Sequence, residues 1–177
     1  MPDVVLDTNT IGDFLSQYFN PQAADRGRKK FSEEGMLSRI MVAPINRILV
    51  NYRRHELGAD IQSPYAMGLV VTSTFAFIEL SRNWQTMVNG RFSIYQLEAF
   101  LIEPPEWFNL APVDESLLPY YCEIPTDVFV RGERHAIEWC DAIHAATADS
   151  RGRDSLLATT DQRLQAIPHL QSRILGR

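Results

Sequence analysis

The spacing of apolar residues along the chain predicts short strands that alternate with helices. An apolar run from Val4 to Leu6 ends at Asp7, and the residues after it carry a helical apolar face. A second run covers residues 68–72, where Ser73 or Thr74 is placed to cap a following helix. The same patterns predict strands at 108–113, 156–159 and near 173–175, and helices at 93–102, 115–121, 135–150 and twice within 22–64, where Pro44 and Pro64 act as breaks.

This alternation is typical of an α/β domain with a central sheet. Strands separated by helices pair in parallel and are covered by helices on both faces. We therefore expect one domain over residues 1–177, with a three-layer α/β/α arrangement and a mostly parallel sheet. Residues 22–64 are expected to form a helical, basic insertion. Parallel sheets of this kind bind ligands at the ends of their strands.

The composition fits one domain with an ordinary core. The chain has 177 residues, of which 45% are hydrophobic. No run of 18 apolar residues occurs, and Asp3 and Asp7 interrupt any apolar leader, so we expect a cytoplasmic protein that does not enter a membrane. The two cysteines, Cys122 and Cys140, are too far apart to form a CxxC motif and are read as small hydrophobic residues.

Charge is distributed unevenly along the chain. The net charge is -5, which does not favour general affinity for nucleic acids. Residues 26–54, however, contain eight basic and two acidic residues, a net +6, which leaves -11 for the remainder. Two interpretations of this stretch stay open: a solvated helix surface, or a surface that contacts phosphates.

Asp141 stands out because small and apolar residues surround it on all sides of the helix predicted at 135–150. A carboxylate removed from water needs a cation, a proton or a metal ion. Arg134 or His144 could pair with it in a purely structural role, and a binding site is the other interpretation. His144 itself is read as a packed helix residue.

Four acidic residues in apolar surroundings are predicted to converge. Asp7 and Asp161 each follow a predicted strand, Glu79 lies on the helix after another strand, and Asp141 is the fourth. Carboxylates gathered in one place repel each other unless cations separate them. Because all the ligands are oxygens, the pattern favours one or two Mg²⁺ or Mn²⁺ ions over zinc.

Four phrases, VVLDTNTIGDFL, VVTSTFAFIEL, CDAIHAATA and LLATTDQRL, resemble in this order the acidic motifs of PIN-domain ribonucleases, which include the VapC-like toxins of type II toxin-antitoxin pairs. The resemblance implies that the four acids bind the metal and catalyse the reaction. It also implies supporting roles for three small polar residues, Thr8, Asn9 and Thr159. The basic residues expected to hold the RNA backbone are Arg28, Lys29, Lys30, Arg53 and Arg54.

The activity implied by this resemblance is metal-dependent hydrolysis of RNA phosphodiester bonds. The implied partners are the RNA substrate, a cognate antitoxin and a second copy of the chain in a homodimer. Two alternatives remain: a non-catalytic PIN-like module that binds RNA or protein, and a different metal-dependent phosphohydrolase. Asp7 and Glu79 are separated by more residues than in the compact toxins, and the excess lies in the basic insertion.

Overall fold

The computed structural model describes residues 1–19, 39–58, 68–82 and 92–175. Its strands are β1 (Val4–Leu6), β2 (Val70–Ser73), β3 (Phe108–Ala111), β4 (Asp127–Val130), β5 (Glu133–Ala136), β6 (Leu156–Ala158) and β7 (Ile174–Leu175). Its helices are α1 (Thr8–Phe19), α4 (Arg39–Glu56), α5 (Thr74–Arg82), α7 (Ile94–Ile102), α8 (Leu118–Tyr121), α9 (Trp139–Ser150) and α10 (Gln162–Gln165), with the 3-10 helices η2 (Glu115–Leu117) and η3 (Pro168–Arg173). None of these helices is both long and apolar enough to cross a bilayer.

A five-stranded parallel sheet forms the centre of the described residues, in the order β3-β2-β1-β6-β7. β1 lies between two neighbours, and Val5 is in register with Val71 on one side and with Leu157 on the other. The outer pairs, β2 with β3 and β6 with β7, are parallel too. These pairings confirm the predicted α/β class and its largely parallel sheet.

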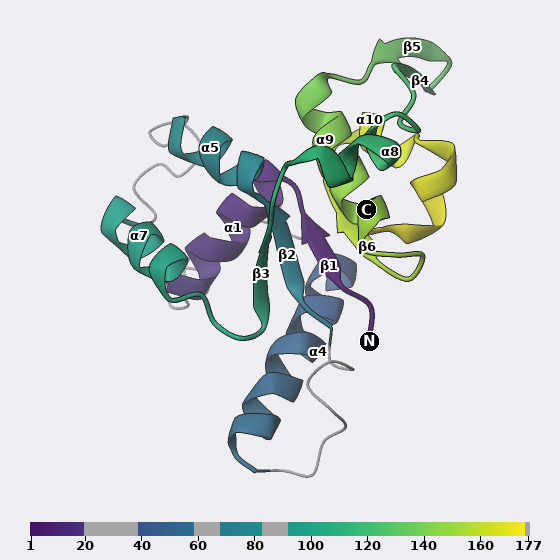
Figure 1. The fold of residues 1–177 in the computed structure, drawn as a ribbon. Coiled ribbons are helices and arrows are strands. Elements are labelled where there is room, and N and C mark those ends of the chain that lie inside the picture. The colour runs from purple at the N-terminus through teal and green to yellow at the C-terminus, as the bar shows by residue number, and fades with distance from the viewer. Residues whose placement is uncertain (20–38, 59–67, 83–91, 176–177) are drawn as a thin grey trace.

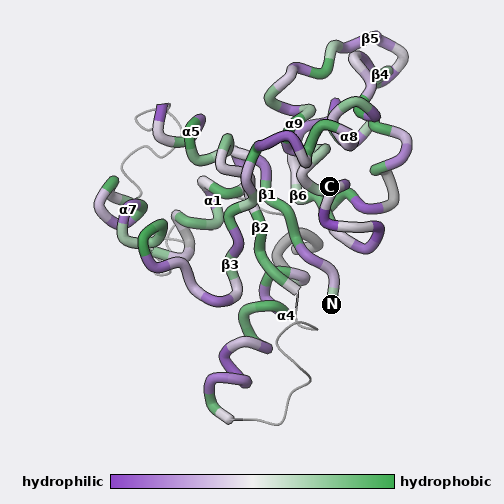
Figure 2. The backbone as a smooth tube through the Cα atoms, in the orientation of Figure 1, coloured by the Kyte–Doolittle hydropathy of each residue, from purple (hydrophilic) through white to green (hydrophobic). Residues whose placement is uncertain are grey.

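Both faces of the sheet are buried. Val4 and Leu6 of β1 belong to one hydrophobic cluster and Val5 to another, as the alternating directions of strand side chains require. Figure 1 shows α1, α5 and α7 on one side of the sheet and α8, α9 and α10 on the other. The arrangement is compatible with three layers. Figure 2 shows hydrophobic residues along β1 and β2 between these groups of helices.

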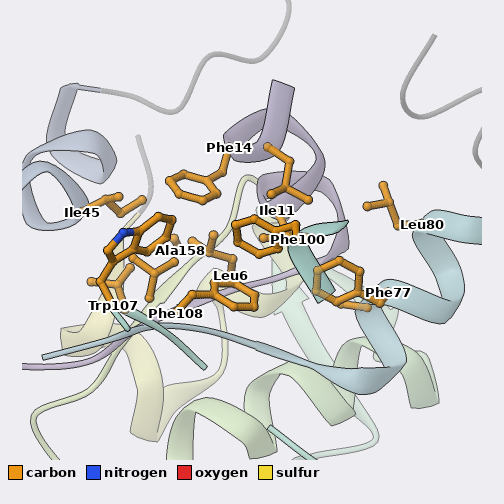
Figure 3. Close-up of a cluster of buried hydrophobic side chains, with 14 of the residues drawn as sticks. Leu6, Ile11, Phe14, Ile45, Phe77, Leu80, Phe100, Trp107, Phe108 and Ala158 are labelled. Atoms are coloured by element: carbon orange, nitrogen blue, oxygen red, sulfur yellow. The ribbon is translucent and has the colours of Figure 1, made fainter. Parts of the chain in front are cut away.

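Aromatic side chains fill much of the cluster that contains Leu6 (Figure 3). The rings of Phe100 and Phe108 meet edge to face with their centroids 4.7 Å apart, and those of Phe14 and Trp107 with theirs 5.8 Å apart. Edge-to-face pairs are favourable beyond the area that they bury. This cluster therefore anchors α1 and α7 on the sheet, and α1 begins directly after Asp7, one of the four predicted acids.

Side-chain caps fix where two of the helices begin. The Ser73 hydroxyl accepts a hydrogen bond from the amide of Ala76, 3.1 Å away, and starts α5 at the end of β2. Ser93 and Gln96 form the reciprocal capping box of α7. The sequence left Ser73 and Thr74 open as the first cap and placed the second helix at 93–102, so both helix starts agree with the structure to within one residue.

The break expected at Pro44 is wrong, since Pro44 lies inside α4. A proline within a helix loses one backbone hydrogen bond and costs about 3 kcal/mol. The same helix buries Ile45, Ile48 and Tyr52 in the hydrophobic core, and each buried side chain of this size contributes about 1.5–3 kcal/mol. Packing therefore outweighs the proline. Pro64 and most of the predicted insertion lie outside the described residues.

The helix predicted over 135–150 is also corrected at its start. Residues 133–136 form β5, which pairs with β4 in an antiparallel hairpin, and α9 begins only at Trp139. Arg131 and Gly132 connect the two strands, and both have positive φ, as tight hairpin turns require. The alternating VFV before an Arg-Gly pair was the available signal, and the small apolar residues after it concealed the hairpin.

Candidate metal centre

The predicted acids are arranged around the edge at which the parallel strands end. The chain continues from β1 to β2 on one side, while β6 lies on the other side of β1. The strand order thus reverses between β1 and β6, and parallel sheets bind ligands at the carboxyl ends of the strands beside such a reversal. Asp7 directly follows β1, and Asp161 follows β6 after Thr159 and Thr160. α9 runs back toward the start of β6, so Asp141, in its first turn, lies at the same edge (Figure 1).

Asp7 is buried and held by a local contact. Its Oδ1 accepts hydrogen bonds from the amide and the hydroxyl of Thr10, each at 2.8 Å. The same hydroxyl lies 3.0 Å from the carbonyl oxygen of Ala158, at the end of β6. Asp7 thus caps the start of α1, and Thr10 ties it to the neighbouring strand. Both of its hydrogen bonds use one carboxylate oxygen.

Thr8, Glu79 and His144 form a connected polar group. The Thr8 hydroxyl donates to Oε2 of Glu79, and its oxygen lies 3.0 Å from Nε2 of His144. Because the single hydroxyl hydrogen is used on Glu79, the Thr8 oxygen must accept from Nε2–H of His144. The ring proton is thereby assigned to Nε2. The other ring nitrogen, Nδ1, is buried without a hydrogen-bond partner among the described residues.

Arg163 lies between two of the predicted acids. Its Nε and Nη2 donate to Oδ2 of Asp161 at 3.1 and 2.7 Å, and Nη2 lies 2.8 Å from Oδ2 of Asp141. A third carboxylate, that of Glu138, is 3.7 Å from Nη1. The contact with Asp141 is close enough for an ion pair, but it is not aligned as a hydrogen bond. Within the described part of the chain, the buried Oδ2 of Asp141 therefore lacks a hydrogen-bond donor.

The surroundings shift the pKa values of Asp141 and Glu79 in opposite directions. Burial raises the pKa of Asp141 above its ordinary value; Arg163 opposes this effect and the charge of Asp161 adds to it. The hydrogen bond with His144 lowers the pKa of Glu79 against the effect of burial, and Thr8 contributes in the same direction. Glu79 is thus an ionised carboxylate at neutral pH. The charged form of Asp141 is the one that gains from an additional nearby cation.

The donor chemistry of the site fits a hard divalent cation. Asp141 and Asp161 offer carboxylate oxygens, the ligands that Mg²⁺ and Mn²⁺ prefer, and the buried Oδ2 of Asp141 has no hydrogen-bond donor among the described residues. The four acids do not form one compact group of ligand atoms. Within the described ranges such a group is made by Glu138, Cys140 and Asp141. Burial raises the pKa of the Cys140 thiol, so it is a poor ligand at neutral pH.

Among the other predicted residues, Thr159 contacts one of the acids, whereas Asn9, Arg53 and Arg54 are exposed. Thr159 is buried, and its hydroxyl accepts a hydrogen bond from the amide of Asp161 at 3.0 Å, which positions that acid. Asn9 is exposed at the start of α1. Arg53 and Arg54 are exposed in the last turn of α4, at the end that leads into the start of β2 and hence away from Asp7 (Figure 1). Arg28, Lys29 and Lys30 lie outside the described residues.

The sequence did not reveal two contacts at the candidate site. His144 was read as a packing residue, and it is indeed buried, yet its Nε2 reaches Thr8 and Glu79. Arg163 was not singled out at all, although it follows Asp161 by two positions. The spacing DxR within the last motif was a local signal, because an Asp that caps a helix lies within reach of the side chain two residues later.

Comparison with known proteins found no matching family model, no matching curated protein and no matching solved structure.

Proposed function

We propose that the chain is a metal-dependent endoribonuclease with a PIN-like domain. One observation carries the proposal. Asp141 of α9 and Asp161, which follows β6, both contact the guanidinium of Arg163 at the edge where the strand order reverses. Asp7 and Glu79 stand at the same edge. The four acids would hold one or two Mg²⁺ or Mn²⁺ ions, as the resemblance to the PIN motifs implies.

Each acid contributes in a different way. A divalent ion bound at this edge would polarise a phosphate and lower the pKa of a water molecule. Asp141 would gain most from such an ion, because its buried Oδ2 has no hydrogen-bond donor within the described residues. Glu79 is kept ionised and oriented by Thr8 and His144. Asp7 is fixed by its capping bonds, and Thr159 fixes the backbone of Asp161.

A route in which His144 acts as a general acid or base is not supported. Such a reaction needs histidines that can exchange protons with the substrate. Both nitrogens of His144 are buried: Nε2 is engaged with Thr8, and Nδ1 has no partner within the described part of the chain. His144 therefore serves to position Thr8 and Glu79.

The test is cleavage of a labelled single-stranded RNA with Mg²⁺, Mn²⁺ or EDTA, beside a small phosphate ester. We expect RNA cleavage that EDTA abolishes and that Asp7→Asn or Asp141→Asn reduces by at least about a hundredfold, as for the loss of a principal electrostatic contact. Unchanged cleavage in these variants would reject the assignment.

Asp149→Asn is the matched control. Asp149 lies on the same helix as Asp141, and its side chain is 18% exposed against 17%. It pairs with Arg173 beyond the far end of α9 rather than at the candidate site. The control should lose some stability and keep its cleavage rate, which separates damage to α9 from loss of a ligand.

A non-catalytic binding module is the second candidate, and Arg163 favours it. A guanidinium that already neutralises Asp141 and Asp161 would suit a domain that keeps the acids for structure alone. Binding of RNA without cleavage under any metal condition would support this function. Hydrolysis of the phosphate ester alone would instead indicate a different phosphohydrolase.

A role as the toxin of a toxin-antitoxin pair is a finer part of the proposal. Expression of the chain should then arrest growth, and Asp141→Asn should relieve the arrest. Co-expression of a small neighbouring gene that encodes an antitoxin should relieve it as well. Sedimentation of the purified protein would test the homodimer that the resemblance implies.

A further inference from the structure

Arg163 holds two acids with contacts of unequal quality. Toward Asp161 its Nε donates to Oδ1 at 3.2 Å and its Nη2 to Oδ2 at 2.7 Å, the forked geometry that guanidinium uses best, and its backbone amide also donates to Oδ1 at 2.8 Å. Toward Asp141 it has only a 2.8 Å approach without hydrogen-bond alignment. The guanidinium is thus anchored on Asp161 and held to Asp141 mainly by charge.

The position of Arg163 overlaps with that of a bound metal ion. Mg²⁺ lies about 2.1 Å from a ligand oxygen. Nη2 of Arg163 is 2.8 Å from Oδ2 of Asp141, so an ion on that side of the oxygen would meet the guanidinium at less than contact distance. Two positive groups so close together would also repel each other. Asp141 therefore cannot hold Arg163 and a metal ion on the same side of Oδ2.

We propose that Arg163 is a built-in counter-ion that competes with the divalent metal for Asp141. In the metal-free protein the guanidinium joins Asp141 to Asp161 and keeps the two carboxylates together. Metal binding requires it to leave Asp141, while the capping bond and the short link to Asp161 retain it nearby. The inference rests on the proposed function, because it takes Asp141 as a metal ligand.

The test compares wild type with Arg163→Gln after EDTA treatment. The dissociation constant for Mn²⁺, measured by titration calorimetry, should fall about two- to fivefold in the variant, the range of a partly exposed ion pair. The melting temperature of the metal-free variant should be lower than that of the wild type, because the two carboxylates lose their shared cation. Added Mn²⁺ should raise it by more than it raises the wild-type value.

Arg151→Gln is the matched control. Arg151 pairs with Asp3 at 2.8 Å, and its side chain is 30% exposed against 31% for Arg163. Asp3 precedes β1, so this pair lies at the opposite edge of the sheet from the acids. The substitution changes the net charge equally and should leave Mn²⁺ affinity unchanged. Arg163→Lys, which keeps the charge and loses the fork, should fall between wild type and Arg163→Gln.

The outcomes distinguish this inference from the proposed function. Tighter Mn²⁺ binding by Arg163→Gln, with no change in Arg151→Gln, supports the competition. Equal or weaker binding overturns it, while Mn²⁺ binding by the wild type that Asp141→Asn abolishes would still support the metal site. If neither the wild type nor Arg163→Gln binds Mn²⁺, both the inference and the proposed function are rejected.

Discussion

The hydroxyl of Thr8 donates a hydrogen bond to the carboxylate of Glu79, 71 residues further along the chain. The contact joins the first residue of α1 to α5, and His144 brings in α9 through its Nε2, 3.0 Å from the same hydroxyl. Three helices are thus tied together at the edge of the sheet by one small polar group. These bonds position Glu79 directly, and through His144 they hold the helix that carries Asp141.

Thr8→Val should destabilise the protein by about 1–3 kcal/mol. Valine has nearly the same shape as threonine but no hydroxyl, so Glu79 loses a donor and Nε2–H of His144 loses its acceptor in a mostly buried place. Urea unfolding measures the change, and Thr8→Ser, which keeps the hydroxyl, should recover most of it. A fully stable Thr8→Val protein would show that the polar group contributes nothing to folding.

Ala146→Leu should destabilise the protein by about 1–3 kcal/mol through overpacking. Ala146 is fully buried in α9, where the helix lies against the sheet. Ala99→Leu on the exposed side of α7 serves as the control and should change the free energy of unfolding by less than about 0.5 kcal/mol. Equal effects of the two substitutions in urea unfolding would contradict the close approach of α9 to the sheet.

Pro44→Ala should stabilise the protein by about 1–3 kcal/mol. Alanine restores the amide hydrogen within α4 and removes the clash of the proline ring with the preceding turn. Thermal unfolding followed by circular dichroism would show a higher melting temperature. A lower value would mean that the proline ring makes packing contacts worth more than the helical hydrogen bond.

Asp127 should respond to pH through its partner across the hairpin. The hydrogen bond from Arg134 lowers the pKa of Asp127 below its ordinary value of 3.8. Because the pKa of Asp127 is lower in the folded protein than in the unfolded chain, its ionised carboxylate stabilises the folded hairpin above pH 3.8. This stabilisation is lost as the pH falls through the pKa of the folded state. A carboxyl NMR titration should show that Arg134→Gln moves the pKa of Asp127 upward. No movement would show that the pair does not persist in solution.

Elements specified by neighbouring residues could be predicted from the sequence. β1, β6 and α7 agree closely with their apolar patterns and caps, because strand alternation and capping act over a few positions. The hairpin β4–β5 had a local signal that the small apolar residues after it concealed. The course of α4 through Pro44 could not be predicted, because it depends on packing against the core. The pairing order of the strands is likewise absent from any local pattern.

For the candidate site, the order of residues along the chain was enough to predict that Asp7 and Asp161 follow strands and that Glu79 and Asp141 lie on helices, and parallel strands bring their carboxyl ends to one edge. Which side chains meet at that edge follows only from the folded arrangement: His144 contacts Thr8 and Glu79, and Arg163 contacts Asp141 and Asp161. Chain direction follows from the order of elements, whereas side-chain contacts depend on how each helix is rotated and packed against the sheet, and residues far apart in the chain fix that rotation.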